Sequence, residues 1–289
     1  MKIGDYFVTP LCEGRILRDG GVAFGLLPRD VWSEFAEADD HNRVTFSLTC
    51  FLLQGHGKNI LIDAGVGTKL GPDGESLLGI HRTDLMDALL QDAGVTREAI
   101  DHVVLTHLHT SAAGGLTELD ENRVLVPAFP NATVTVQNGE WERAVHANLR
   151  TRQFINKEDF EPLLWHQVMN LVEGDSEFLP GLYFEVTGGH TKMHQVIRIE
   201  SRGESGIFWG GLVPGVHYFD LNTVAADDLY PLRSMERKAE ILDEAIEKGA
   251  IHFLSHDPLF SAVQVFGDIR GGDGVSFEAL LTHTPAQRI

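Results

Sequence analysis

The sequence predicts an α/β fold in which two mixed β-sheets pack face to face and helices cover their outer sides. Three observations support this. Short β-rich runs recur along the whole chain, some are joined as hairpins by Gly-rich turns, and others alternate with segments of helical period. The order of strand, helix and strand, followed by strand and helix again with hairpins between them, suggests two sheets that pack together and are covered by helices.

The individual elements follow from periodicity and turn signals. The segment GHGK between the first two strands indicates a hairpin. Residues 83–94 have a helical period, with Thr83 as the expected N-cap and Gly94 at the end, another helix begins near Glu140, and 234–250 gives the clearest helix. Strands are expected at 44–54, 59–65, 101–107, 132–137, 182–190, 195–201, 206–212 and 251–256.

Composition limits the classes of function. A chain of 289 residues with 43% hydrophobic side chains suits one large α/β domain, and we expect a single domain over 1–289. The 42 acidic residues exceed the 23 Lys and Arg, a formal charge of −19 that repels phosphate backbones and anionic lipid. We therefore expect a small-molecule partner, with neither nucleic acid nor a membrane as partner.

The cysteines and the N-terminus indicate the compartment. Cys12 and Cys50 are the only cysteines and are far apart in sequence, so neither a disulfide framework nor a cysteine zinc site is expected. No apolar run has the length of a membrane span, and no basic stretch precedes an apolar one at the start. A cytoplasmic protein is expected. An exposed β-rich N-terminal segment that pairs with a second copy would give a homodimer.

Four histidines share one structural position. His107, His109, His190 and His256 each directly follow a predicted strand, and strand ends are where loops gather and sites form in layered α/β folds. Neutral imidazoles suit Zn²⁺ and other borderline metals, and three of them with an open position make a catalytic zinc site. The sequence therefore predicts a metal centre built on these side chains.

The same segments resemble the metallo-β-lactamase superfamily, in particular its lactonase-like hydrolase branch. The similar segments are NILIDAGVG, VTREAIDHVVLTHLH, TGGHTKMHQV, IFWGGLVPG and FLSHDP, in the family's order. The resemblance implies an αββα sandwich. It also implies that the first metal is held by His107, His109 and His190, all of which are present.

The resemblance fails at the second metal. The positions that normally supply an Asp, a His and a bridging Asp are Ser111, Ala112 and Gly211, and only His256 of that set remains. A divalent cation needs several donors and compensating negative charge, so a second ion is not expected to bind. We expect one ion, zinc in the first place, with iron or manganese as alternatives.

Three further residues are candidates for catalysis. Asp63 ends the NILID strand and is expected to orient a histidine ligand, since a carboxylate fixes an imidazole tautomer well. His256 is expected to act as a fourth, weaker ligand or as a general base. Tyr218, by resemblance to the tyrosine of related lactonases, is a candidate for binding an oxyanion or protonating a leaving group.

The residues around the missing ligands are all small. Replacing ligands by small residues both empties a metal site and enlarges a cavity, so these positions predict a remodelled pocket with room for an organic group. The set comprises Thr110, Ser111, Ala112, Ala113, Gly211 and Gly215.

These features lead to three hypotheses about function. The first is a metal-dependent hydrolase in which one ion acts as a Lewis acid toward a lactone, ester or similar carbonyl and a bound water attacks. The second is a scaffold or pseudoenzyme, natural or engineered, that has lost hydrolysis and binds a different ligand in the enlarged pocket. The third is iron-dependent oxygen chemistry, against which the missing carboxylate ligand argues.

Overall fold

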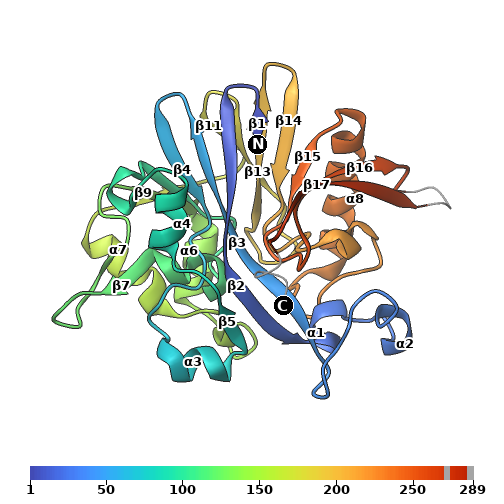
Figure 1. Cartoon of the computed structure of the whole chain (residues 1–289), viewed down its shortest axis with the longest axis horizontal. Helices are drawn as coiled ribbons and strands as arrows, with labels where there is room; N and C mark the ends of the chain where they lie inside the picture. The colour runs from blue at the N-terminus through green and yellow to red at the C-terminus, as the bar shows by residue number, and fades with distance from the viewer. Residues whose placement is uncertain (270–273, 285–289) are drawn as a thin grey trace.

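Two β-sheets form the centre of the fold, with helices on the outer side of each (Figure 1). The structure is a computed structural model that describes residues 1–269 and 274–284. The layers confirm the predicted αββα sandwich. Within the described residues, every helix is too short or too polar to cross a membrane.

The first sheet is mixed. Strands β1 to β4 pair antiparallel, whereas β4, β6, β9 and β10 run parallel to one another. The predicted hairpin is confirmed between β3 and β4, where His56 and Gly57 have φ of 52° and 70°. In spatial order the strands are β1 (Lys2–Ile3), β2 (Tyr6–Asp19), β3 (Arg43–Gly55), β4 (Lys58–Ile62), β6 (His102–Val104), β9 (Thr133–Gln137) and β10 (Met169–Val172), with β5 (Ile80–Arg82) paired to β2.

The second sheet comes from the C-terminal half. All its neighbouring strands are antiparallel except β14 and β15, which are parallel. A separate small pair is formed by β7 (Thr117–Leu119) and β8 (Leu125–Pro127). The order in the sheet is β11 (Ser176–Leu179), β12 (Leu182–Val186), β13 (Gln195–Ser201), β14 (Glu204–Phe208), β15 (Ile251–Phe253), β16 (Phe260–Gly267) and β17 (Val275–Thr282).

Helices close both outer sides. Those near the first sheet are α4 (Met86–Asp92), α6 (Asn138–Val145) and α7 (Glu161–Trp165), and α8 (Pro231–Glu247) lies beyond the second (Figure 1). The remaining α-helices are α1 (Gly20–Phe24), α2 (Arg29–Trp32), α3 (Gly71–Leu77) and α5 (Thr110–Ala113). Short 3₁₀ helices occur at Arg97–Ala99, Gly114–Leu116, Arg152–Phe154, Lys157–Asp159 and Val216–Phe219.

Alternation along the strands divides the hydrophobic core into layers. In β3, Phe51 and Leu53 face the second sheet, where Phe208 of β14 packs with them, while Cys50 and Leu52 face the helices of the first sheet. Successive side chains of a strand point to opposite faces, so one apolar strand serves two layers. Each fully buried Phe or Leu stabilises the fold by about 1.5–3 kcal/mol.

Some predicted boundaries are wrong. The helix expected at 83–94 begins at Met86, and Thr83 is not its N-cap, because the Thr83 backbone N–H donates to the Glu13 carbonyl and continues the pairing of β5 with β2. The strands expected at 101–107 and 182–190 end at Val104 and Val186. In both cases the remaining residues leave the sheet and form the loops that carry histidines.

The N-terminal segment lies at an edge of the first sheet. Strand β2 pairs with β3 from Phe7 to Asp19, β1 pairs with the start of β2 and is the last strand on that side, and β5 pairs with Gly14–Ile16. The expected pairing of this segment with a second copy stays a prediction.

Candidate metal centre

The candidate site lies where loops from the two sheets meet. His107 and His109 follow β6 of the first sheet, and His190 follows β12 of the second. Gln195, the first residue of β13, ties the two sides together: its side-chain amide donates to the Leu105 carbonyl at 2.8 Å, and its amide oxygen accepts from Gln137 at 2.7 Å. Both glutamines are buried, so these bonds fix the loops in an interior where unpaired polar groups are costly.

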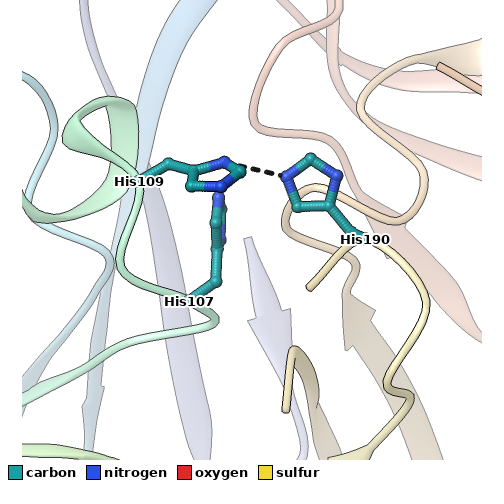
Figure 2. Close-up of side chains that lie close together, drawn as sticks. All are labelled: His107, His109 and His190. Carbon is teal, nitrogen blue, oxygen red and sulfur yellow. Dashed lines mark hydrogen bonds between the residues drawn. The ribbon is translucent and has the colours of Figure 1, made fainter. Parts of the chain in front are cut away.

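The three histidines converge (Figure 2). The ring centroids lie 4.7 Å apart for His107 and His109, 4.9 Å for His107 and His190, and 4.8 Å for His109 and His190. One nitrogen of each lies within 4.8 Å of the others, and all three side chains are buried. The structure thus brings together the three residues that the sequence predicts as metal ligands.

Asp63 acts on His107 through an intermediate hydroxyl. The Thr106 hydroxyl donates to Asp63 Oδ2 at 2.9 Å and lies 2.8 Å from His107 Nδ1, and the Thr106 backbone N–H donates to Asp63 Oδ1 at 2.8 Å. Because the hydroxyl proton goes to the carboxylate, the hydroxyl accepts the Nδ1 proton of His107 and leaves Nε2 as the free donor atom. Burial raises the pKa of Asp63 to about 7.

His190 is oriented directly by a carboxylate. Its Nδ1 lies 2.7 Å from Asp228 Oδ1, with both groups buried, so Nδ1 carries the proton and Nε2 faces the other histidines. Nε2 lies 3.1 Å from Nδ1 of His109. Two nitrogens bound to one tetrahedral zinc at about 2.05 Å would lie about 3.3 Å apart, so this separation fits a shared ion.

A buried glutamate holds the two ligand loops against each other. Glu140 of α6 accepts hydrogen bonds from the Leu108 backbone N–H at 3.2 Å and from the Thr191 hydroxyl at 2.7 Å, and it pairs with Arg143. Leu108 lies between the first two histidines and Thr191 follows the third. One side chain therefore fixes both loops.

The protonation states suit a metal. Burial holds the pKa values of His107 and His109 well below their usual range, so both rings are neutral, as ligands must be. Burial also opposes protonation of His190, but the hydrogen bond and charge of Asp228 outweigh it and raise the pKa of His190. Three imidazoles supported by carboxylates and a hydroxyl form a donor set that fits zinc.

The second-metal positions contain no replacement donor set. Ser111 contributes a hydroxyl, and Ala112 is buried with its carbonyl bonded to the Ala64 N–H at 2.6 Å. Gly211 is in close contact with His190: a Cβ built on it would lie 2.6 Å from Nε2 of that ring. The imidazole therefore occupies the space that a side chain at position 211 would need.

A cavity of about 370 Å³ opens at the histidines. Among the residues predicted to form a remodelled pocket, Thr110, Ser111 and Gly211 line it. The prediction is wrong for Ala112 and Ala113, which are buried away from it, while Gly215 lines an adjoining cavity of about 550 Å³.

His256 lines both cavities and stands apart from the three-histidine group. Its Nδ1 lies 2.8 Å from the Ser47 carbonyl, so the Nδ1 proton is donated there and Nε2 is left as an acceptor. Burial lowers the pKa of His256 to about 4, which keeps the ring neutral.

Tyr218 is not placed for the predicted role. Its hydroxyl is buried and donates to the Ala23 carbonyl at 2.7 Å, and it lines the adjoining cavity instead of the one at the histidines. Burial raises the pKa of this phenol, which opposes proton donation. The prediction of Tyr218 as an oxyanion or leaving-group residue is therefore corrected.

Sequence reasoning missed four charged residues of the site. Besides Asp228 and Glu140, these are Arg18 and Asp227, which form an ion pair of 2.6 Å and line the cavity. The signal available was the adjacent pair of acids before the proline of α8. His190, Asp227 and Asp228 also form a cluster within 4.8 Å, in which Asp227 Oδ2 pairs with Arg18 and Asp228 Oδ1 with the His190 ring, while Asp227 Oδ1 is buried without a hydrogen-bond partner among the described residues.

Comparison with known proteins places this architecture in a family. The model of the metallo-β-lactamase superfamily matches residues 45–204, more than half of the chain. The chain belongs to the metallo-β-lactamase superfamily. Proteins of this superfamily bind metal ions, typically zinc. The curated relatives that this chain matches are named N-acyl homoserine lactonases.

The relatives agree with the lactonase-like resemblance. An N-acyl homoserine lactonase of Bacillus thuringiensis is 28% identical over 184 residues, which cover 56% of this chain and 66% of the relative, slightly less than two thirds of its length. A probable metal-dependent hydrolase from Staphylococcus aureus has a TM-score of 0.89 at 28% identity, covering 98% of this chain and 99% of that one. The dizinc quorum-quenching lactonase AidC shares the fold, with a TM-score of 0.78 at 19% identity and coverage of 98% and 97%.

Proposed function

We propose that this protein is a metal-dependent hydrolase of a lactone or ester carbonyl that works with one ion on His107, His109 and His190. The observation that carries the proposal is the convergence of three buried, neutral or carboxylate-supported imidazoles at a cavity of about 370 Å³. That volume is within the range of small-molecule sites. The lactonase relatives supply the substrate class as a proposal for this chain.

The chain's own residues orient the metal ligands and a water. Asp63, acting through Thr106, and Asp228 bind His107 and His190 on their Nδ1 sides, so in the neutral rings the Nε2 atoms are left as donors aimed at one point. A zinc ion bound there supplies a Lewis acid that polarises a carbonyl and lowers the pKa of water to about 7. His256 lines the cavity with Nε2 as its unprotonated nitrogen, and its low pKa suits it to orienting a water better than to removing a proton.

A mononuclear site is part of the proposal. The side chains at 111, 112 and 211 offer one neutral hydroxyl among them, and His256 alone cannot hold a divalent ion. Zinc is the first expectation, with iron or manganese as alternatives, because imidazole binds all three.

The decisive experiment is elemental analysis of the purified chain beside His190→Ala and the control His146→Ala, an exposed histidine outside the site. We expect about one metal per chain in the wild type and the control and none in His190→Ala. Hydrolysis of a lactone and ester panel should disappear with a chelator and return with zinc. Two ions per chain would refute the mononuclear site. A chain that does not bind added zinc would refute the proposal of a metalloenzyme.

A second candidate function is a ligand-binding scaffold without hydrolysis. It is favoured by the selective loss of the Asp, His and Asp donors at 111, 112 and 211 while the cavity remains open. A protein with one bound metal that turns over no member of the panel, yet binds ring-opened lactone products, would support this alternative over the hydrolase.

We further propose a single domain over 1–289, a cytoplasmic location and a homodimer as the assembly to test. Size-exclusion chromatography with light scattering gives the mass in solution directly. A mass near the 31.9 kDa of one chain would reject the dimer.

A further inference from the structure

The cavity contains one cation that the family's metal chemistry does not explain. Arg18 lies near the end of β2, and its Nη2 lies 2.6 Å from Oδ2 of Asp227. Its guanidinium carbon is 5.6 Å from the centroid of the Phe46 ring. Arg18 and Asp227 line the same cavity as His109, His190 and His256.

Part of the guanidinium is available to a ligand. A guanidinium carries five N–H donors, and the only hydrogen-bond partner of this one among residues 1–269 and 274–284 is Asp227. The Arg18 side chain is 23% exposed, whereas Asp227 is 4% exposed. Asp227 and the Phe46 ring therefore hold the Arg18 guanidinium in place, while its remaining N–H donors stay accessible from the cavity.

The charges that line the cavity leave room for an anion. Arg18 and Asp227 both line it and offset each other. Asp63 and Asp228 support His107 and His190 from behind and do not line it. A divalent ion on the histidines would therefore leave the lining positive, and an anionic ligand would offset that charge.

The walls indicate what else the ligand carries. Beyond the charged groups, the cavity is lined by the apolar side chains of Ile16, Val66, Leu70, Ile80 and Phe154. Such walls accept a hydrocarbon body and remove water from around the guanidinium, which strengthens a charge-assisted hydrogen bond.

We propose that Arg18 is a substrate-binding residue that holds the carboxylate of a small, otherwise apolar ligand beside the three-histidine site, in the cavity that Ser111 and Gly211 also line. Asp227 is its positioning residue. A guanidinium fork suits a carboxylate because it can donate two parallel N–H bonds to the two oxygens. The inference rests on the proposed function only in taking this ligand to be the hydrolase's substrate or product.

The first test measures binding, not turnover. Hexanoate and hexanamide have the same chain and nearly the same shape but differ in charge, and each is titrated by calorimetry into the full-length protein as purified, with metal content checked. The double variant Arg18→Gln/Asp227→Asn removes the pair without changing net charge or leaving Asp227 buried and unpaired. We expect the affinity ratio of hexanoate to hexanamide to fall about 10- to 100-fold, the range of one charge-assisted bond.

Two companion variants make the result specific. Asp227→Asn alone keeps the guanidinium of Arg18 and removes the carboxylate that competes for it. The affinity ratio of hexanoate to hexanamide in this variant should therefore equal or exceed that of the wild type. Arg43→Gln/Asp39→Asn removes an Arg–Asp pair of 2.7 Å that lies outside the cavity, and should leave the ratio unchanged. An unchanged ratio in the Arg18 double variant, or an equal fall in the Arg43 double variant, would overturn the proposal.

A kinetic comparison identifies the source of the carboxylate. If the substrate carries it, the Arg18 double variant raises KM for a lactone with a ring carboxylate and not for its methyl ester. If hydrolysis creates it, KM for the neutral lactone stays the same and inhibition by the ring-opened product weakens. A normal metal content with unaltered KM and product inhibition would reject Arg18 as a binding residue while leaving the proposed hydrolase intact.

Discussion

The tight contact between Gly211 and His190 makes a single methyl group a test of the metal site. Gly211 does not have a positive φ, so Gly211→Ala adds no backbone strain, but the new Cβ would lie 2.6 Å from His190 Nε2. The ring carbon Cδ2 would lie closer still, and ordinary Cβ contacts begin at 3.4 Å, so the ring must retreat by more than about 0.8 Å. Metal sites tolerate displacements of only about 0.5 Å.

The displaced ring cannot keep both of its bonds. Moving Nε2 away from the other histidines weakens the metal site, and tilting the ring instead lengthens the 2.7 Å bond to Asp228. Overpacking of this size costs about 1–3 kcal/mol, which corresponds to a zinc dissociation constant about 5- to 150-fold larger.

A competition titration against a chromophoric chelator measures the constant directly. Gly74→Ala is the matched control, because that glycine lies in α3 without a positive φ and its added Cβ would meet only the Leu70 side chain, at 3.1 Å or more. A Gly211→Ala protein that binds zinc as tightly as the wild type would refute the argument that His190 fills this space.

Three further predictions follow from buried charges. Asp228→Asn keeps the shape but removes the charge that orients His190, so zinc affinity should fall about 10- to 100-fold, and an unchanged chelator titration would contradict this. Glu140→Gln leaves an arginine without its buried partner and should lower the free energy of unfolding in urea by about 3–5 kcal/mol, whereas a loss below 1 kcal/mol would contradict the role of Glu140. Burial lowers the pKa of Lys238 to about 8 against 10.5 for the free side chain, so the unfolded state binds its proton more tightly. Unfolding measured across pH should therefore show the wild type gaining up to about 3 kcal/mol over Lys238→Met as pH rises from 8 to 10.5, and parallel curves would reject this.

The residues that could be predicted from sequence are those whose signal is local. His107 and His109 are two residues apart after a strand, and His190 follows a strand of its own, so strand patterning alone placed them at strand ends. The resemblance then selected these three from fourteen histidines. The αββα order was also available, because alternation and turns are properties of short segments.

The residues that could not be predicted act through contacts distant in sequence. Arg18 and Asp227 are separated by 209 positions, and Glu140 reaches Thr191 across 51. No periodicity connects such pairs, and only the folded chain brings them together. The prediction for Tyr218 is wrong for a related reason. A residue's place in a loop does not determine where its side chain points, and the Tyr218 hydroxyl donates to the Ala23 carbonyl instead of reaching the histidines.

The origin of the histidines in different sheets has a consequence for how the site can be tuned. Two of them follow β6 of the first sheet and one follows β12 of the second, so their mutual spacing depends on how the sheets are aligned. A volume change in the layer between the sheets, at Phe51 or Phe208 for example, is expected to strain the Glu140 and Gln195 hydrogen bonds that join the two ligand loops, without touching the site. We therefore expect the metal affinity of the proposed site to respond to substitutions in the hydrophobic interior, at positions that no comparison of active-site residues would single out.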